Sequence, residues 1–259
     1  MAHETVLITG ASSGIGRELA RCFARDGSRV ALVARTGGAL QTLADELRKT
    51  HKVDARVFTV DLARPDAPTQ VLNHLQTAGF KIDILVNNAG FGAQGRFADL
   101  PLERQMHIVQ VNVTTLTQLT RLLLPAMIER QRGGVLNVAS TAAFQAGPNM
   151  AVYYATKAYV LSLSEALAEE LSGTGVSVTA LCPGPTQTNF FAAAAIRTSR
   201  LFDWSAMSAE TVARIGHDAF RRKRIVAIPG FRNQLLAFLV RLVPRVVARR
   251  IAGSWNKAR

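Results

Sequence analysis

The sequence predicts an α/β fold, a doubly wound parallel β-sheet with helices on both faces. Short apolar runs alternate with helical patterns along most of the 259 residues, and this alternation is typical of parallel sheets built from β-α-β units. With 48% hydrophobic and 19% charged residues, the chain has enough apolar side chains for one large core. Because chains of this length often form one α/β domain, we expect a single domain without an interdomain linker.

The expected elements follow one another in a regular order. The expected strands cover residues 5–9, 29–34, 55–60, 82–87, 134–140, 176–182 and 224–228. The expected helices cover residues 16–26, 38–49, 69–78, 102–130, 151–171 and 209–220, and a loop with short helices covers residues 183–206. Right-handed crossovers bring the carboxyl ends of the strands to one rim of the sheet, where such folds bind ligands.

Two features of the chain indicate a reducing, cytoplasmic location. Its start, MAHETVLITG, lacks the basic region and long apolar core of a signal peptide, and no apolar run nears the ~20 residues of a spanning helix. The two cysteines, Cys22 and Cys182, are too few for a disulfide framework, and we expect both to be buried as free thiols.

A glycine-rich segment, TGASSGIG, lies between the first expected strand and the first helix. Its glycines, Gly10, Gly14 and Gly16, permit a tight turn and a close approach of the backbone to a ligand. The helix N-terminus then offers free N–H groups and a positive dipole end to a pyrophosphate. The spacing differs from the usual Gly-x-Gly-x-x-Gly, but its position predicts a dinucleotide site; a ligand-free turn is the alternative.

A second feature is a Tyr-x-x-x-Lys pair in the expected helix of residues 151–171. Tyr153 and Lys157 are four residues apart, so they share one face of the helix. A nearby positive charge lowers the pKa of a phenol, which makes it a usable general acid or base near neutral pH. The alternative is an ordinary half-buried helix with one aromatic residue and one solvated lysine.

Further motifs occur in a fixed order along the chain. They are Asn87-Asn88-Ala89-Gly90 after the fourth strand, Asn112 in the next helix, Ser140 at the end of the fifth strand, and Pro183-Gly184 after the sixth. Together with the glycine-rich turn and the Tyr-x-x-x-Lys pair, this ordered set resembles the short-chain dehydrogenase/reductase family over roughly residues 5 to 190. Taken singly, Asn87 and Asn112 could be buried structural amides, and Pro183-Gly184 merely a turn.

The resemblance implies a Rossmann-type fold and a catalytic tetrad of Asn112, Ser140, Tyr153 and Lys157. In that family, hydride passes from NADPH to a carbonyl carbon while Tyr153 protonates the oxygen and Ser140 donates a hydrogen bond to it. Lys157 would lower the pKa of the tyrosine and hold the nicotinamide ribose, and Asn112 would position a water in a proton relay. No metal site is expected.

The charge at the end of the second strand predicts the cofactor. Residues 33–35 read Val-Ala-Arg, without the acid that would bond the ribose of NAD and repel a 2′-phosphate. Arg35 could instead bond that phosphate, which predicts NADP; a solvated arginine is the alternative.

Arg17 would add positive charge, and Asp61 resembles the family's adenine-contacting acid, unless it only caps a turn. The implied cofactor contacts are Gly10, Ser12, Ser13, Gly14, Ile15, Gly16, Arg35, Asp61, Leu62, Asn88, Ala89, Gly90, Tyr153, Lys157, Pro183, Gly184, Thr186 and Thr188.

Two apolar groups of residues bear on the substrate and on self-association. In the family, the segment after strand six shapes the substrate pocket; here it contains Phe190, Phe191, residues 192–195, Leu201, Phe202 and Trp204. This favours a lipophilic ketone, steroid-like or 3-oxoacyl-like, unless these side chains only pack on the body. The family's subunit helices predict a homodimer or homotetramer, with the monomer core as the alternative role for their apolar residues. Those residues are Leu116, Leu119, Leu123, Tyr159, Leu163 and Leu167.

The net charge of +13 comes mainly from the C-terminus. Residues 221–259 hold eleven Lys or Arg and no Asp or Glu, so the body is nearly neutral and no nucleic-acid partner is expected. We expect residues 1–230 to form the cofactor-binding catalytic domain and residues 231–259 a basic, amphipathic extension packed on it. Pro244 should interrupt its helix. The alternative for this extension is weak peripheral contact with an anionic membrane. The alternatives for the whole chain are an NADP(H)-binding sensor or scaffold with little turnover, and a nucleic-acid-binding protein that uses the basic tail.

Overall fold

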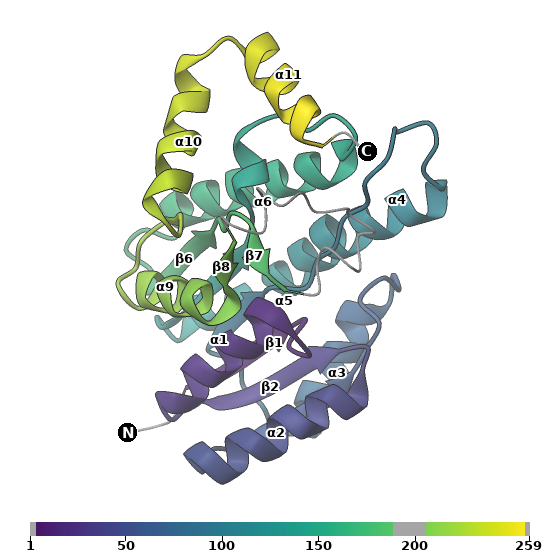
Figure 1. Cartoon of the computed structure of the whole chain (residues 1–259). Helices are drawn as coiled ribbons and strands as arrows, with labels where there is room; N and C mark the ends of the chain where they lie inside the picture. Colours follow the sequence, from purple (N-terminus) through teal and green to yellow (C-terminus); the bar gives the residue numbers. More distant parts are fainter. Residues whose placement is uncertain (1–3, 189–205, 257–259) are drawn as a thin grey trace.

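The computed structural model describes residues 4–188 and 206–256 and confirms the predicted α/β fold (Figure 1). Seven parallel strands form the central sheet in the order β3-β2-β1-β4-β5-β6-β9. These strands are β1 (Thr5–Thr9), β2 (Arg29–Ala34), β3 (Ala55–Thr59), β4 (Ile84–Asn87), β5 (Gly133–Val138), β6 (Val176–Leu181) and β9 (Val226–Ala227). The helices are α1 (Gly14–Arg25), α2 (Gly37–His51), α3 (Ala67–Thr77), α4 (Leu102–Val109), α5 (Leu116–Glu129), α6 (Ala151–Glu170), α9 (Ala209–Arg221), α10 (Phe231–Leu242) and α11 (Arg245–Trp255).

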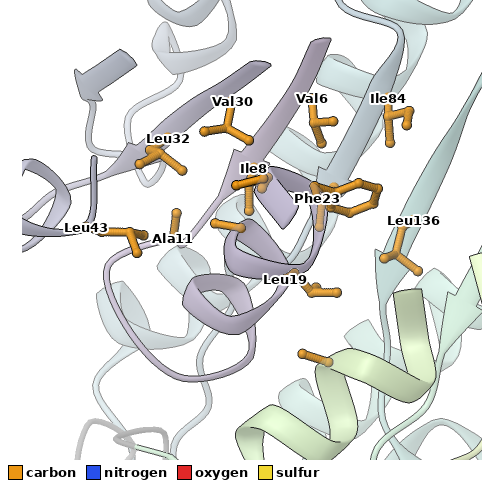
Figure 2. Close-up of a cluster of buried hydrophobic side chains, with 14 of the residues drawn as sticks. Val6, Ile8, Ala11, Leu19, Phe23, Val30, Leu32, Leu43, Ile84 and Leu136 are labelled. Carbon is orange, nitrogen blue, oxygen red and sulfur yellow. The ribbon is translucent and has the colours of Figure 1, made fainter. Parts of the chain in front are cut away.

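Two apolar layers hold the sheet between its helices, because successive side chains of a strand point to opposite faces. On β1, Val6 and Ile8 pack with Leu19 and Phe23 of α1 in one cluster, which Figure 2 shows. Leu7 belongs to the other cluster, which includes residues of α3 and α5. All these β1 side chains are fully buried, so the near-continuous apolar run of the first strand follows from burial on both faces.

The order of the strands reverses between β1 and β4. From β1 the chain moves outward through β2 and β3, and from β4 it moves the other way through β5 and β6. A crevice at the carboxyl ends of the strands next to such a reversal is where open α/β sheets bind ligands. The glycine-rich turn after β1 and the Asn87–Gly90 segment after β4 therefore meet at the predicted rim.

Some elements differ from the sequence prediction. The expected helix over residues 102–130 contains a π-helical segment, η1 (Gln110–Thr115), between α4 and α5. A short 3₁₀ helix, η2 (Thr141–Phe144), and a small parallel sheet of β7 (Thr186–Gln187) and β8 (Met207–Ser208) were not predicted. These elements are only two to six residues long, too short to leave a periodic signal in the sequence.

The C-terminal extension forms two helices joined at a proline, as predicted. Pro244 precedes α11 as its N-cap, and α10 ends at Leu242. Figure 1 shows α10 and α11 projecting from the end of the molecule that lies opposite α2. Among the described residues, none of the helices has the length and apolarity needed to cross a membrane.

The apolar residues predicted for a subunit interface divide into two groups. Leu116 and Leu119 are 4% and 0% exposed, so they belong to the monomer core and their assignment to an interface is wrong. Leu123, Leu163 and Leu167 pack at the margins of the core. Their burial follows from the packing of α5 and α6 against the sheet, which local sequence spacing does not reveal.

Candidate active site

The glycine-rich turn has the backbone shape that a phosphate cradle needs. Gly10 and Gly14 have positive φ values of 65° and 56°, in the left-handed region that favours glycine. Helix α1 begins at Gly14, and its N-cap, Ser13, makes no side-chain capping bond. The first N–H groups of α1 therefore have no capping oxygen from that side chain and can donate to an anion.

Asn88 fastens this turn to the end of β4. Its Nδ2 donates to the carbonyl oxygens of Thr9 (2.9 Å) and Gly10 (3.1 Å). The hydroxyl of Thr9 in turn accepts from the backbone N–H groups of Asn88 (3.0 Å) and Ala89 (3.1 Å). A Cβ at Gly16 would lie 2.3 Å from Asn88 Nδ2, so Gly16 permits this close packing. The sequence prediction missed the role of Thr9, although the residue opens the quoted motif.

A chamber of about 2470 Å³ lies at this rim of the sheet. It is larger than the ~300–1,000 Å³ of a typical ligand pocket, so it has room for a dinucleotide and a second molecule. Two predicted site residues, Gly16 and Asn112, do not line it. The predicted residues that do are Gly10, Ser12, Ser13, Gly14, Ile15, Arg35, Asp61, Leu62, Asn88, Ala89, Gly90, Ser140, Tyr153, Lys157, Pro183, Gly184, Thr186 and Thr188.

Tyr153 reaches the chamber from the first turn of α6, and Ser140 from the segment after β5. Ser140 is the N-cap of η2, and its Oγ accepts from the N–H of Ala142 at 3.1 Å. Burial raises the pKa of Tyr153 to about 12, and a hydrogen bond with Ser140 opposes that shift. In this structure the predicted lowering of the pKa of Tyr153 is therefore not met, because burial is the largest cause of the shift and raises this pKa. The phenol stays protonated near neutral pH and can act as a proton donor.

Lys157 lies one helical turn beyond Tyr153 and is only 5% exposed. Its Nζ donates to the backbone oxygen of Val138 at 2.7 Å and lies 5.9 Å from the centre of the Tyr153 ring. Burial lowers the pKa of Lys157 to about 8, which a charge interaction with Cys182 partly offsets. Like Cys22, that cysteine is a free, buried thiol, as predicted.

Asn112 lies behind the chamber, within η1, and is 1% exposed. Its Nδ2 donates to the Phe91 carbonyl (3.0 Å) and to Thr156 Oγ1 (3.0 Å), while its Oδ1 accepts from the Phe91 N–H (3.2 Å). The Asn112 side chain thus connects the segment after β4 with helix α6. A Cβ at position 90 would lie only 3.0 Å from Asn112 Oδ1 and 3.3 Å from Lys157 Nζ. Glycine, which lacks this atom, therefore lets both side chains pack close to the backbone there.

The edge of the chamber at β2 and β3 carries the residues predicted to select the cofactor. Arg35 is exposed and lines the chamber, and no ion pair to it occurs within the described ranges. Arg17 does not line the chamber and contacts Glu18 at 3.3 Å, so it adds little to the field there. Asp61 caps the turn that follows β3 by accepting from Ala63 N–H at 3.1 Å, and it also lines the chamber.

The segment after β6 closes the chamber on the side of Ser140. The backbone oxygen of Pro183 accepts from the N–H of Thr141 at 2.9 Å. A Cβ at Gly184 would lie 2.5 Å from Asn233 Oδ1 of α10, and one at Gly14 would lie 3.0 Å from the methyl carbon of Thr188. The segment after β6 therefore contacts both the glycine-rich turn and helix α10.

Apolar side chains of the C-terminal segment line another part of the chamber. They are Phe231, Leu236, Leu239, Val240, Val243, Ile251 and Trp255. No sequence pattern predicted these residues in the site. The apolar residues that were predicted there lie outside the described residues; they are Phe190, Phe191, residues 192–195, Leu201, Phe202 and Trp204.

Tyr154, the next residue on α6, lines the same chamber as Tyr153. Its hydroxyl donates to Asn256 Oδ1 at 3.5 Å, and Asn256 also accepts from Gln94 and donates to Pro148. The end of α11 therefore contacts helix α6 through residues that lie about a hundred positions apart in the chain.

Asn87, in contrast, has the structural role left open by its sequence. Its Nδ2 donates to Thr120 Oγ1 (3.0 Å) and to Asn137 Oδ1 (2.9 Å), and the residue is 3% exposed. A buried amide whose donors are both satisfied stabilises the packing of β4 against α5 and β5. Asn87 therefore does not reach the chamber.

A proton donor beside a cradle for a pyrophosphate is what a dinucleotide-dependent oxidoreductase requires. Residues 4–197 match the family model of the short chain dehydrogenases. The chain belongs to this family and is one of its oxidoreductases.

Curated relatives and solved structures agree with the family. The ketoacyl reductase HetN of a Nostoc species is 35% identical over 184 residues, 71% of this chain and 64% of that protein. The human very-long-chain 3-oxoacyl-CoA reductase is 33% identical over 184 residues, 70% of this chain and 58% of that protein. The chain thus spans less than two thirds of the length of both relatives.

Two solved structures cover more of the molecule. A short-chain dehydrogenase of Sphingobium yanoikuyae, solved in complex with NADPH, has a TM-score of 0.82 at 36% identity over 88% of each chain. A 7β-hydroxysteroid dehydrogenase has a TM-score of 0.87 at 27% identity over 96% of each chain.

Proposed function

We propose that this protein is an NADPH-dependent reductase that converts a carbonyl group of a lipophilic substrate to an alcohol. The observation that carries the proposal is the placement of three side chains in one chamber. Tyr153 and Ser140 share a hydrogen bond there, and the ammonium of Lys157 lies one helical turn away. The cofactor and the reaction class follow from this site, and the substrate class follows from the apolar lining.

The residues at the rim fit NADPH. The uncapped N-terminus of α1 and the positive-φ glycines of the preceding turn suit its pyrophosphate. Exposed Arg35, which has no acidic partner among the described residues, suits its 2′-phosphate. NADPH, when bound, supplies the hydride that reduces the carbonyl carbon. The related Sphingobium protein, which was solved with NADPH, supports the same choice.

Each catalytic side chain has a distinct part in the reduction. Negative charge grows on the carbonyl oxygen, and Tyr153 donates its phenolic proton to that oxygen. Ser140 donates a hydrogen bond to the same oxygen and so stabilises the developing charge. The ammonium of Lys157 adds a positive charge behind the tyrosine. Asn112 acts as a positioning residue, because its amide holds Phe91 and Thr156 in place.

The apolar lining supports a large, lipophilic substrate. Side chains of α10 and α11, such as Leu239 and Trp255, share the chamber with Met150 beside the catalytic tyrosine. Apolar surface of this kind favours ligands that lose little hydrogen bonding when they leave water. Two related proteins, a 3-oxoacyl-CoA reductase and a 7β-hydroxysteroid dehydrogenase, support the 3-oxoacyl-like and steroid-like classes that the sequence suggested.

A screen of carbonyl compounds with NADPH tests this function. We expect oxidation of NADPH, followed by its absorbance, with hydrophobic ketones, 3-oxoacyl thioesters or oxosteroids, and little with short polar ketones. Substrates should gain in kcat/KM with apolar size, by roughly up to a factor of four per buried CH₂ group. Tight NADPH binding without turnover of any compound would instead support the sensor or scaffold alternative.

The rate of reduction should depend on the protonation of Lys157. Its pKa is lowered to about 8, whereas that of Tyr153 is raised to about 12, so both groups are mostly protonated at pH 7. We expect kcat/KM for reduction to be flat below about pH 8 and to fall as Lys157 loses its proton above that value. Initial rates measured below and above about pH 8 show whether kcat/KM falls as the pH rises. Lys157→Arg, which keeps its charge throughout, should lack the inflection even if its absolute rate is low, and a wild-type rate that stays constant to about pH 10 would contradict the assignment.

Self-association is the second part of the proposal that follows from the family. Of the residues predicted for the subunit interface, Tyr159 is exposed, and Leu122 and Ile128 of α5 are further exposed apolar residues that the prediction did not include. Tyr159 also bonds Thr117 of α5 at 2.9 Å, so the two helices present one joint surface. A homodimer or homotetramer formed through this surface remains a prediction.

A further inference from the structure

The C-terminal helices α10 and α11 carry most of the exposed apolar side chains of the molecule. Eleven of the eighteen large hydrophobic residues that are exposed in the described part of the chain lie between Phe231 and Trp255. The chamber accounts for some of these, such as Phe231, Leu236 and Trp255, which line it. The remainder do not line the chamber and need a separate explanation, because soluble monomers rarely expose large contiguous apolar patches.

Five further exposed apolar residues of the two helices lie outside the lining of the chamber. They are Leu235, Phe238 and Leu242 on α10, and Val246 and Val247 on α11, and none of them lines the chamber. We call these five residues the outer surface. Phe238 and Leu242 are 58% and 66% exposed. On α10 the steps of three and four residues place all three side chains on one stripe.

Four arginines accompany the outer surface. Arg241, Arg245, Arg249 and Arg250 are exposed and do not line the chamber. No ion pair involves them among residues 4–188 and 206–256, and residues 231–259 contain no Asp or Glu. An apolar stripe bordered by long basic side chains is the pattern of a helix that lies in a membrane interface, where arginines keep their charges at the headgroups.

Charge decides between a lipid surface and a second copy of this chain. A two-fold symmetric contact would place the same surface on both subunits, and it would bring the arginines of each copy together without any acidic residue of this surface between them. An anionic bilayer complements those charges instead. We propose that the outer surface of α10 and α11 docks on anionic lipid bilayers.

The remainder of the structure is compatible with docking of this kind. The helices project from the body opposite α2 (Figure 1), so a flat surface can reach them. They are also fixed at both ends, by Asn233 against Gly184 and by Asn256 against Pro148 and Tyr154. Their inner sides meanwhile line the chamber, so docking would set the apolar part of the site beside the lipid. The proposal concerns the outer surface alone and does not depend on the reductase assignment.

Vesicle co-sedimentation of the full chain, without substrate, tests the proposal. The probes are vesicles of phosphatidylcholine alone and of equal parts phosphatidylcholine and phosphatidylglycerol, each at low and at high salt. We expect binding to the anionic vesicles at low salt and its loss at high salt, because salt screens the arginines. Binding should be weak or absent with phosphatidylcholine alone.

Two pairs of variants separate the apolar and basic contributions. Phe238→Ser with Leu242→Ser should weaken binding by on the order of tenfold or more. Phe97→Ser with Leu102→Ser, which are 66% and 73% exposed elsewhere, is the matched control and should leave it unchanged. Arg241→Gln with Arg249→Gln should weaken binding roughly 25-fold, about fivefold for each arginine. Lys49→Gln with Lys81→Gln, on the body, is the control for that pair.

Three results would overturn the proposal. In the first, the full chain stays in the supernatant with anionic vesicles at low salt. In the second, the Phe238 and Leu242 variant binds as tightly as the unaltered chain, which would indicate attraction to any polyanion. In the third, light scattering shows that this variant loses oligomeric mass while vesicle binding is absent, which would identify the outer surface as a contact between protein subunits.

Discussion

Replacing Tyr153 by phenylalanine should lower kcat by about 10²–10⁴-fold while the fold and NADPH binding persist. The change removes only the hydroxyl, the group that gives its proton to the carbonyl oxygen and shares a hydrogen bond with Ser140. Water in the chamber is a poor substitute for that hydroxyl, because it is not held in position and is a weaker acid than the phenol even at the raised pKa of about 12. Steady-state kinetics with a substrate from the carbonyl screen give the loss in kcat, and a fluorescence titration gives NADPH affinity.

The chain contains a matched control for this substitution. Tyr159 lies on the same helix, but it is 39% exposed, bonds Thr117 and does not line the chamber. Tyr159→Phe should therefore leave kcat within a factor of about two, since exposed hydrogen bonds contribute little. Tyr154 cannot serve as this control, because it lines the chamber and contacts Asn256. Near-normal turnover of Tyr153→Phe would show that the proton comes from another group.

Changing Arg35 to aspartate should reverse the cofactor preference from NADPH to NADH. One hydrogen bond to a charged group contributes ~1.5–3 kcal/mol, so loss of the arginine weakens NADPH binding by roughly 10- to 150-fold. The new carboxylate repels the 2′-phosphate and can accept a bond from the 2′-hydroxyl of NADH. Titration of both cofactors into the two proteins measures the change as a ratio of dissociation constants.

Arg17 provides the comparison for this experiment. It lies close to the glycine-rich turn in sequence, but it contacts Glu18 and does not line the chamber. Arg17→Ala should leave the ratio of the two dissociation constants nearly unchanged. If the unaltered protein binds NADH as tightly as NADPH, Arg35 does not select the cofactor and the charge argument fails.

Local patterns in the sequence were sufficient for the sheet and for the position of the rim. Val6 to Ile8 formed an apolar run because β1 is buried on both faces, and Gly10 and Gly14 were recognisable because their φ values require glycine. Tyr153 and Lys157 were visible because helical spacing alone places them on one face. In each of these cases the relevant neighbours are close in the chain, or the backbone conformation restricts the residue type.

The packing of distant segments decided the features that the sequence left open or misassigned. Leu119 belongs to the core and not to a subunit contact, because α5 lies against the sheet. The pKa of Tyr153 depends on how many protein atoms surround the phenol, and their number is set by elements far away in the chain.

The sequence by itself determined the parallel fold, the glycine-rich turn and the spacing of Tyr153 and Lys157, because each depends on local backbone preferences and on periodic burial. Only the tertiary structure decided that α10 and α11 line the chamber, and that their outer surface is left exposed. Those two facts depend on contacts such as that between Tyr154 and Asn256. Residues so far apart acquire a common environment only when the chain has folded.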